Sequence, residues 1–116
     1  KFCVYCGELA DTEEHFPPVS FGNAGYLFPC CSECNNLAGT EHPFSFELRA
    51  DYVKSKIKQK YKKLLTMPAW NDEDLNELGL FLRSHIEEAE KARKITTQRL
   101  AWSPMTYLAT LDVGEI

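Results

Sequence analysis

The clearest hydrophobic pattern in the chain lies between residues 46 and 65. Its apolar residues are spaced by three, four or combinations of them, which places them on one face of a helix. Lysines fill many of the remaining positions, and Ser45 is a suitable N-cap. The pattern therefore predicts one long helix over about residues 45–65. Its apolar stripe consists of Leu48, Tyr52, Val53, Ile57, Tyr61, Leu64 and Leu65.

A second helical pattern follows the break at residues 67–69. Asn71 or Asp72 can cap it, and the acidic residues 72–74 suit the positive end of a helix dipole. Gly79 weakens the pattern locally, and Pro104 ends it. We expect an acidic, amphipathic helix over about residues 72–100. Its inner stripe consists of Leu75, Leu78, Leu82, Ile86 and Ala89.

The first third of the chain has a pattern of short strands, loops and one short helix. Residues 12–16 and 26–28 are candidate strands, and prolines follow both. A helix then begins at Cys31 or Ser32 and stops at Gly39. These elements predict an α+β fold, in which a splayed hairpin and a short helix precede two long helices.

Charge is distributed unevenly along the 116 residues, a length that suits one domain. The net charge is −4, yet residues 49–63 contain seven basic residues and one acid. Phosphate neutralisation by Lys and Arg dominates non-specific DNA affinity, so this segment predicts a nucleic-acid contact. A solvated helix face is the alternative. The expected contact residues are Arg49, Lys54, Lys56, Lys60 and Lys63.

The chain has no apolar run near the roughly 20 residues that a transmembrane helix needs. Its amino end has no apolar signal core either. We therefore expect a cytoplasmic protein that does not contact a membrane.

Four cysteines form two C-x-x-C pairs, at Cys3 and Cys6 and at Cys31 and Cys34. Two such pairs can supply the four thiolates of a structural Zn²⁺ site. Cys30 could replace Cys31, because a spacing of x3 to Cys34 is also workable. The first 40 residues contain little apolar bulk, whereas zinc can contribute roughly 10 kcal/mol to the folding of a small module. A thioredoxin-like redox pair is less favoured, because it needs only one C-x-x-C.

Three segments together resemble the HNH endonucleases. They read CVYCG at 3–7, EHFPPVSFG at 14–22 and LFPCCSECNN at 27–36. The likeness is closest to a zinc-stabilised subgroup with an E/D-H-x-P-P signature, and it covers roughly residues 1–40. It implies a zinc-knuckle ββα-metal core over 1–43, in which a hairpin and a helix clasp one divalent cation. Residues 44–116 would then be a helical extension of the same compact unit.

The resemblance also implies roles for particular residues. His15 would be the general base that activates water, which suits an imidazole at neutral pH. Glu14 and Asn35 would hold the catalytic cation, and such oxygen ligands suit Mg²⁺ or Mn²⁺. Tyr26 stands where the family usually has an Asn, so Asn23 would pin the hairpin loop instead.

Two other residues remain alternatives at this site. Asn36 could replace Asn35, and His42 is a second candidate metal ligand.

The resemblance implies an endonuclease that hydrolyses DNA phosphodiester bonds, with RNA as a further substrate to consider and a homodimer left open. A catalytically inactive, zinc-dependent module that binds nucleic acid or protein is the main alternative. A structural protein that binds others through its last helix is a third interpretation.

Overall fold

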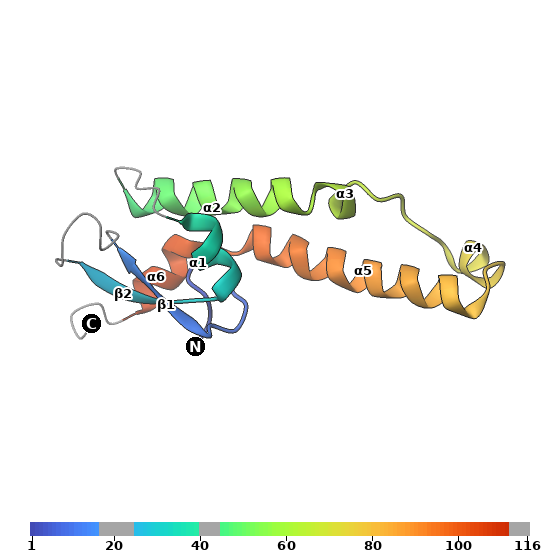
Figure 1. The fold of residues 1–116 in the computed structure, drawn as a ribbon, viewed down its shortest axis with the longest axis horizontal. Coiled ribbons are helices and arrows are strands. Elements are labelled where there is room, and N and C mark those ends of the chain that lie inside the picture. The colour runs from blue at the N-terminus through green and yellow to red at the C-terminus, as the bar shows by residue number, and fades with distance from the viewer. Residues whose placement is uncertain (17–24, 40–44, 112–116) are drawn as a thin grey trace.

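The computed structural model describes residues 1–16, 25–39 and 45–111. Within these ranges the chain forms a two-stranded antiparallel sheet and a series of helices. The sheet, α1 and α6 gather at one end of the molecule, and α2 and α5 run side by side away from it (Figure 1). The molecule is elongated, with extents of 58 × 23 × 20 Å. It has a packed end from which a helical arm protrudes, whereas the sequence predicted one compact unit.

The hairpin consists of β1 (Thr12–Phe16) and β2 (Tyr26–Cys30). Glu14 pairs with Phe28 and His15 pairs with Leu27. Glu14 and Phe28 are both buried, so this face of the hairpin points into the protein. β2 continues two residues beyond the predicted strand, through Pro29, because a two-stranded sheet has only edge strands and these tolerate proline.

The short helix α1 (Ser32–Ala38) follows β2 directly, as predicted. The Cys31 side chain caps it by accepting a hydrogen bond from the Cys34 N–H. Gly39 ends it with a φ of +54°, a backbone conformation that favours glycine.

The predicted helix over 45–65 is two helices, α2 (Phe46–Lys60) and α3 (Lys62–Leu65). Ser45 caps α2 through a bond from the Leu48 N–H, which confirms the predicted N-cap. The predicted apolar stripe is correct at Val53 and Ile57, which are buried. It is wrong at Leu48, which is exposed. The buried face of the first turn consists of Phe46, Arg49 and Ala50.

The predicted helix over 72–100 is also interrupted. Its parts are α4 (Asp72–Asn76), which Asn71 and Asp74 cap reciprocally, and α5 (Leu80–Ala101). Gly79 stands at the N-cap of α5, so the glycine divides the helix instead of merely weakening it. Pro104 ends α5 as expected, but it also starts the short helix α6 (Pro104–Thr110).

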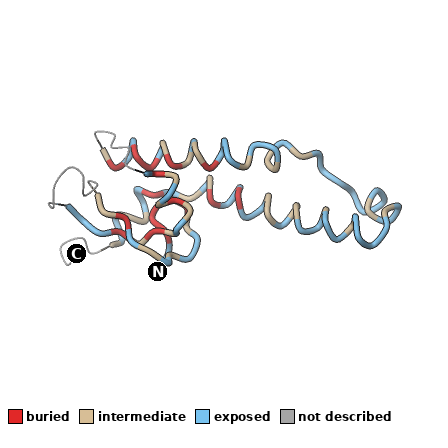
Figure 2. The backbone as a smooth tube through the Cα atoms, in the orientation of Figure 1, coloured by how far each residue is buried: buried red, intermediate tan, exposed pale blue. Residues whose placement is uncertain are grey.

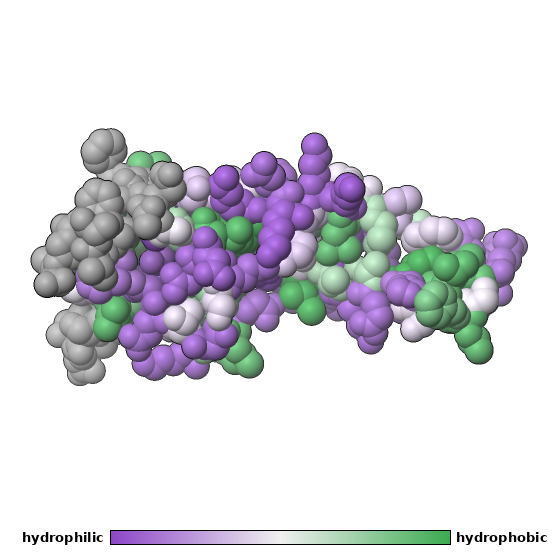
Figure 3. Space-filling model, viewed as in Figure 1, coloured by the Kyte–Doolittle hydropathy of each residue, from purple (hydrophilic) through white to green (hydrophobic). Residues whose placement is uncertain are grey.

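The core lies where the hairpin, α1 and the start of α2 meet. Phe46 is at its centre, with ring centroids 5.5 Å from Tyr5 and 5.3 Å from Phe28. Buried residues concentrate at this end, and the far end of the arm is exposed (Figure 2). Figure 3 shows hydrophobic side chains at that far end, where Leu80 and Phe81 are 88% and 74% exposed.

Candidate metal centre

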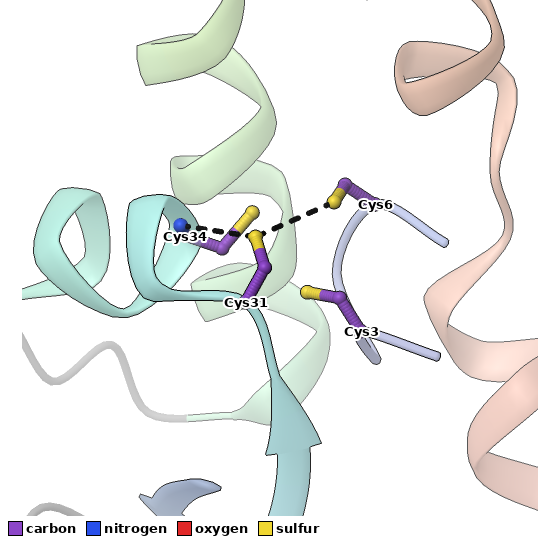
Figure 4. Close-up of side chains that lie close together, drawn as sticks. All are labelled: Cys3, Cys6, Cys31 and Cys34. Carbon is purple, nitrogen blue, oxygen red and sulfur yellow. Dashed lines mark hydrogen bonds between the residues drawn. The ribbon is translucent and has the colours of Figure 1, made fainter. Parts of the chain in front are cut away.

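Four cysteine side chains converge between the amino-terminal loop and the start of α1. Cys3 and Cys6 come from the loop, Cys31 is the N-cap of α1, and Cys34 lies in its first turn (Figure 4). Their sulfur atoms all lie within 4.8 Å of one another. The two C-x-x-C pairs therefore meet as the sequence predicted.

The spacing of the sulfur atoms fits a tetrahedral zinc site. With Zn–S bonds of about 2.3 Å, tetrahedral geometry places the sulfurs about 3.8 Å apart. The Cys6 and Cys31 sulfurs are 3.7 Å apart, and none of the five cysteines forms a disulfide. This cluster could hold a zinc ion with four thiolate ligands and no open position, which is the arrangement of a structural site.

The amino-terminal loop is held in shape by its backbone and by Trp102. The Gly7 N–H donates to the Cys3 carbonyl at 2.9 Å, and Gly7 has a φ of +81°. The indole of Trp102 packs against Gly7 and donates from Nε1 to the Val4 carbonyl at 3.1 Å. The segment between α5 and α6 thus clamps the loop that carries Cys3 and Cys6.

The thiols of this cluster differ in proton affinity. The hydrogen bond with Cys30 lowers the pKa of Cys3 to about 3. The hydrogen bonds with Cys3 and Cys31, together with burial, raise the pKa of Cys34. Since a metal binds the thiolate form, zinc binding would release thiol protons, and acid would weaken the site.

The fifth cysteine, Cys30, lies beside this group without being part of it. It is fully buried at the end of β2, with its sulfur 4.0 Å from that of Cys3. Its sulfur also lies 3.3 Å from the Cys31 carbonyl oxygen. The four-residue group contains Cys31, the preferred choice of the sequence prediction.

Glu14, the expected ligand of a catalytic cation, forms a buried ion pair with Arg49. The Arg49 Nη2 atom lies 3.1 Å from Glu14 Oε1, and the Tyr5 hydroxyl donates to Glu14 Oε2 at 2.8 Å. Burial and then the Glu14 charge raise the pKa of Tyr5, so its hydroxyl stays protonated. Arg49 is 0% exposed and its guanidinium is paired with Glu14, so its predicted phosphate contact, which stays a prediction, would require it to leave that pair.

Asn35 and His15 belong to the same hairpin–helix unit as Glu14. The Asn35 side-chain amide donates to the Glu13 carbonyl at 3.2 Å, which ties α1 to β1. His15 is partly buried on β1, where alternation places it on the face opposite Glu14. Asn36 is exposed, and both Asn23 and His42 lie outside the described residues.

In the part of the chain that the structure describes, acidic, histidine and cysteine side chains form no second group of metal ligands. In the described ranges, the cysteine cluster is the only group of three or more such residues placed to hold a metal ion. The roles expected for Glu14, Asn35 and His15 therefore stay predictions.

The predicted phosphate-binding lysines differ in how available they are. Lys54 donates to the Trp102 carbonyl, and Lys60 forms an ion pair with Glu33 at 2.7 Å. Lys56 is partly buried and lies over the Tyr52 ring, whereas Lys63 is exposed. Part of the positive charge of α2 therefore has internal partners.

Comparisons with known proteins add no relative. No family model, curated protein or solved structure matches this chain. Among the described helices, none has both the length and the apolar character needed to cross a membrane.

Proposed function

We propose that this chain is a zinc-stabilised, metal-dependent nuclease of the HNH kind, acting on DNA. The observation that supports it is the direct succession of hairpin and helix, with Glu14 and His15 on β1 and Asn35 on α1. Asn35 bonds the β1 backbone one residue before Glu14, so the three predicted residues belong to one small unit. The cysteine cluster at the start of α1 would hold that unit folded.

The proposed chemistry assigns one task to each side chain. His15 would take the proton from the attacking water, which an imidazole can do near neutral pH. Glu14 and Asn35 would hold a hard divalent cation, which supplies charge stabilisation to the phosphate when bound. Glu14 would have to exchange its bonds to Arg49 and Tyr5 for that cation. Since alternation places His15 on the opposite face of β1, the strand would also have to bend for both side chains to reach one site.

A plasmid-cleavage assay with Mg²⁺, Mn²⁺ or EDTA tests this proposal. His15→Ala should reduce the cleavage rate by about 100-fold or more, because a positioned general base contributes that much. Its zinc content and melting temperature should stay close to those of the wild type. His85→Ala is the matched control, since His85 is exposed on α5, in the helical arm. A wild-type protein that cuts no nucleic acid with either cation rejects the nuclease.

A second candidate is a zinc-dependent nucleic-acid-binding module without catalysis. The buried Glu14–Arg49 pair favours it, because both carboxylate oxygens already have partners. Cleavage by the wild type separates the two candidates, and Glu14→Gln, assayed well below its melting temperature, tests the cation site. In a nuclease it should lower the rate, and high Mn²⁺ should restore part of the activity, because a weakened cation site fills at higher concentration. If the protein is a binding module, the wild type should bind DNA but should not cleave it.

A further inference from the structure

Arg99 reaches the cysteine cluster from the far end of the sequence. It lies in the last turn of α5 and is 7% exposed. Its Nη2 atom lies 3.7 Å from the sulfur of Cys34, which is 65 residues away in the chain. Its Nε atom is buried and has no hydrogen-bond partner among the described residues.

A carboxylate on α1 fixes the position of this guanidinium. Glu33 Oε1 lies 2.6 Å from Arg99 Nη1, and the other carboxylate oxygen accepts bonds from Tyr61 and Lys60. Glu33 is the neighbour of Cys34, so the same turn of α1 presents both partners to Arg99. The planar donors of an arginine can contact two acceptors at once, which a lysine cannot do.

The charge of the metal centre explains why the buried guanidinium of Arg99 is favourable beside it. Four thiolates and one Zn²⁺ carry a net charge of −2, and Cys3, Cys6 and Cys34 are buried. A buried charge is costly unless an opposite charge accompanies it. Arg99 is the cationic side chain that contacts a cluster sulfur among the described residues.

We propose that Arg99 is the cationic partner of the metal centre: it offsets the charge of the thiolates, and Glu33 positions it. The inference rests on zinc binding, the structural part of the proposed function, and is independent of nuclease activity. It assigns Arg99 a positioning and charge-balancing role without direct contact with the metal.

Zinc affinity, measured by competition with a chromophoric chelator, tests this role. Arg99→Gln should raise the zinc Kd by about 10-fold or more, the usual cost of removing such a partner of a metal ligand. Arg99→Lys keeps the charge and should recover part of that affinity. Arg83→Gln is the matched control: Arg83 lies on the same helix in an ion pair with Glu87, away from the cysteines, and its replacement should leave the Kd unchanged.

A double-mutant comparison separates charge balance from packing. Cys31→His removes one thiolate charge and leaves the Arg99–Cys34 contact in place, so Arg99→Gln should cost less zinc affinity in that background than in the wild type. An equal cost in both backgrounds, or an Arg99→Gln Kd within about twofold of wild type, overturns the proposal.

Arg99→Gln could lose zinc simply because it does not fold, and Arg99→Lys is the control for that outcome. If Arg99→Gln does not fold, Arg99→Lys decides: zinc loss as complete as in Cys34→Ser overturns the proposal, and retention supports it. A wild type that binds no zinc rejects the metal centre itself. A wild type that binds zinc but cuts no DNA rejects only the nuclease.

Discussion

Gly7 shows how a single residue shapes the metal centre. It has a φ of +81°, and a Cβ placed there would clash with the Trp102 ring. Both the backbone conformation and the close approach of the indole therefore require glycine. The packing of Trp102 in turn orders the loop that carries Cys3 and Cys6.

Gly7→Ala should destabilise the zinc-loaded protein by roughly 2 kcal/mol or more, because it adds both backbone strain and a steric clash. Urea unfolding measures the change. Gly79→Ala is the matched control, since nothing lies within 4 Å of the position of its Cβ and its φ is −64°. Equal decreases in stability in the two variants would contradict this account of Gly7.

Two substitutions in the buried network of Glu14, Arg49 and Tyr5 should reduce stability by different amounts. Glu14→Gln leaves the charge of Arg49 buried without its carboxylate, so it should cost about 3–5 kcal/mol. Tyr5→Phe removes one hydrogen bond to Glu14 and should cost about 1 kcal/mol. Thermal or urea unfolding of both variants gives the ranking, and a larger destabilisation by Tyr5→Phe would reject it.

At the scale of elements, the cysteine cluster joins the amino-terminal loop to α1. The described part of the loop contains no helix and only an isolated bridge between Phe2 and Leu9. Besides the metal, two protein contacts hold this loop against the hairpin and core: the Val4 N–H donates to the Pro29 carbonyl at 2.8 Å, and the buried Tyr5 stacks on Phe46.

Cys34→Ser, or removal of zinc by a strong chelator, should unfold the hairpin and α1, because a structural zinc supplies much of the folding energy of such a module. Amide chemical shifts and metal analysis would follow the unfolding. Cys30→Ala is the control, because Cys30 lies outside the group of four and its replacement should leave one zinc bound. A disulfide between any two of the four cysteines, or a protein without zinc, would contradict the site.

The basic segment formed by α2 and α3 leads to a prediction about the salt dependence of DNA binding. Replacing Lys56, Lys60 and Lys63 by Gln should weaken DNA binding about equally for all sequences and reduce the salt slope by roughly 1 for each phosphate that is no longer neutralised. Lys91→Gln and Lys94→Gln on α5 provide the control, since both residues are exposed. An unchanged slope in the triple variant would assign these lysines to a solvated face.

Local signals in the sequence predict most elements but not the long-range partners. Ser45, Asn71 and Gly39 mark helix ends through short-range capping, so their positions could be predicted. The spacing of the cysteines likewise identifies the four residues that converge. The helix breaks at Tyr61 and Gly79 could not be predicted in this way, because apolar periodicity continues across both.

The partners of Glu14 and Cys34 depend on tertiary packing. Arg49 lies 35 residues from Glu14, and Arg99 lies 65 residues from Cys34. Six lysines follow Arg49 within the next 14 residues, so the charge pattern groups it with them as a surface residue. Burial of an arginine follows from the whole fold and has no local sequence signal.

On the scale of the whole molecule, the protein consists of a packed end and an exposed arm. The packed end contains the cysteine cluster, the hairpin and the aromatic contacts of Phe46. In the arm, the buried residues of α5 are Thr96 and Arg99, both near its carboxyl end. The first three turns of α5 and all of α4 contain no buried residue in the described structure.

Local stability should therefore decrease along the arm. Amide protons of residues 82–90 should exchange with solvent at least about 100-fold faster than those of residues 50–57, because opening the distal helix exposes little buried apolar surface. Hydrogen exchange of the zinc-loaded protein, followed by NMR, measures both segments of helix in one sample. Val53 and Ile57 are fully buried in the second segment, which gives an internal reference for a protected helix. Equal protection of the two segments would contradict this gradient. Protection of residues 82–90 that rises with protein concentration would instead mean that a second copy covers Leu80 and Phe81.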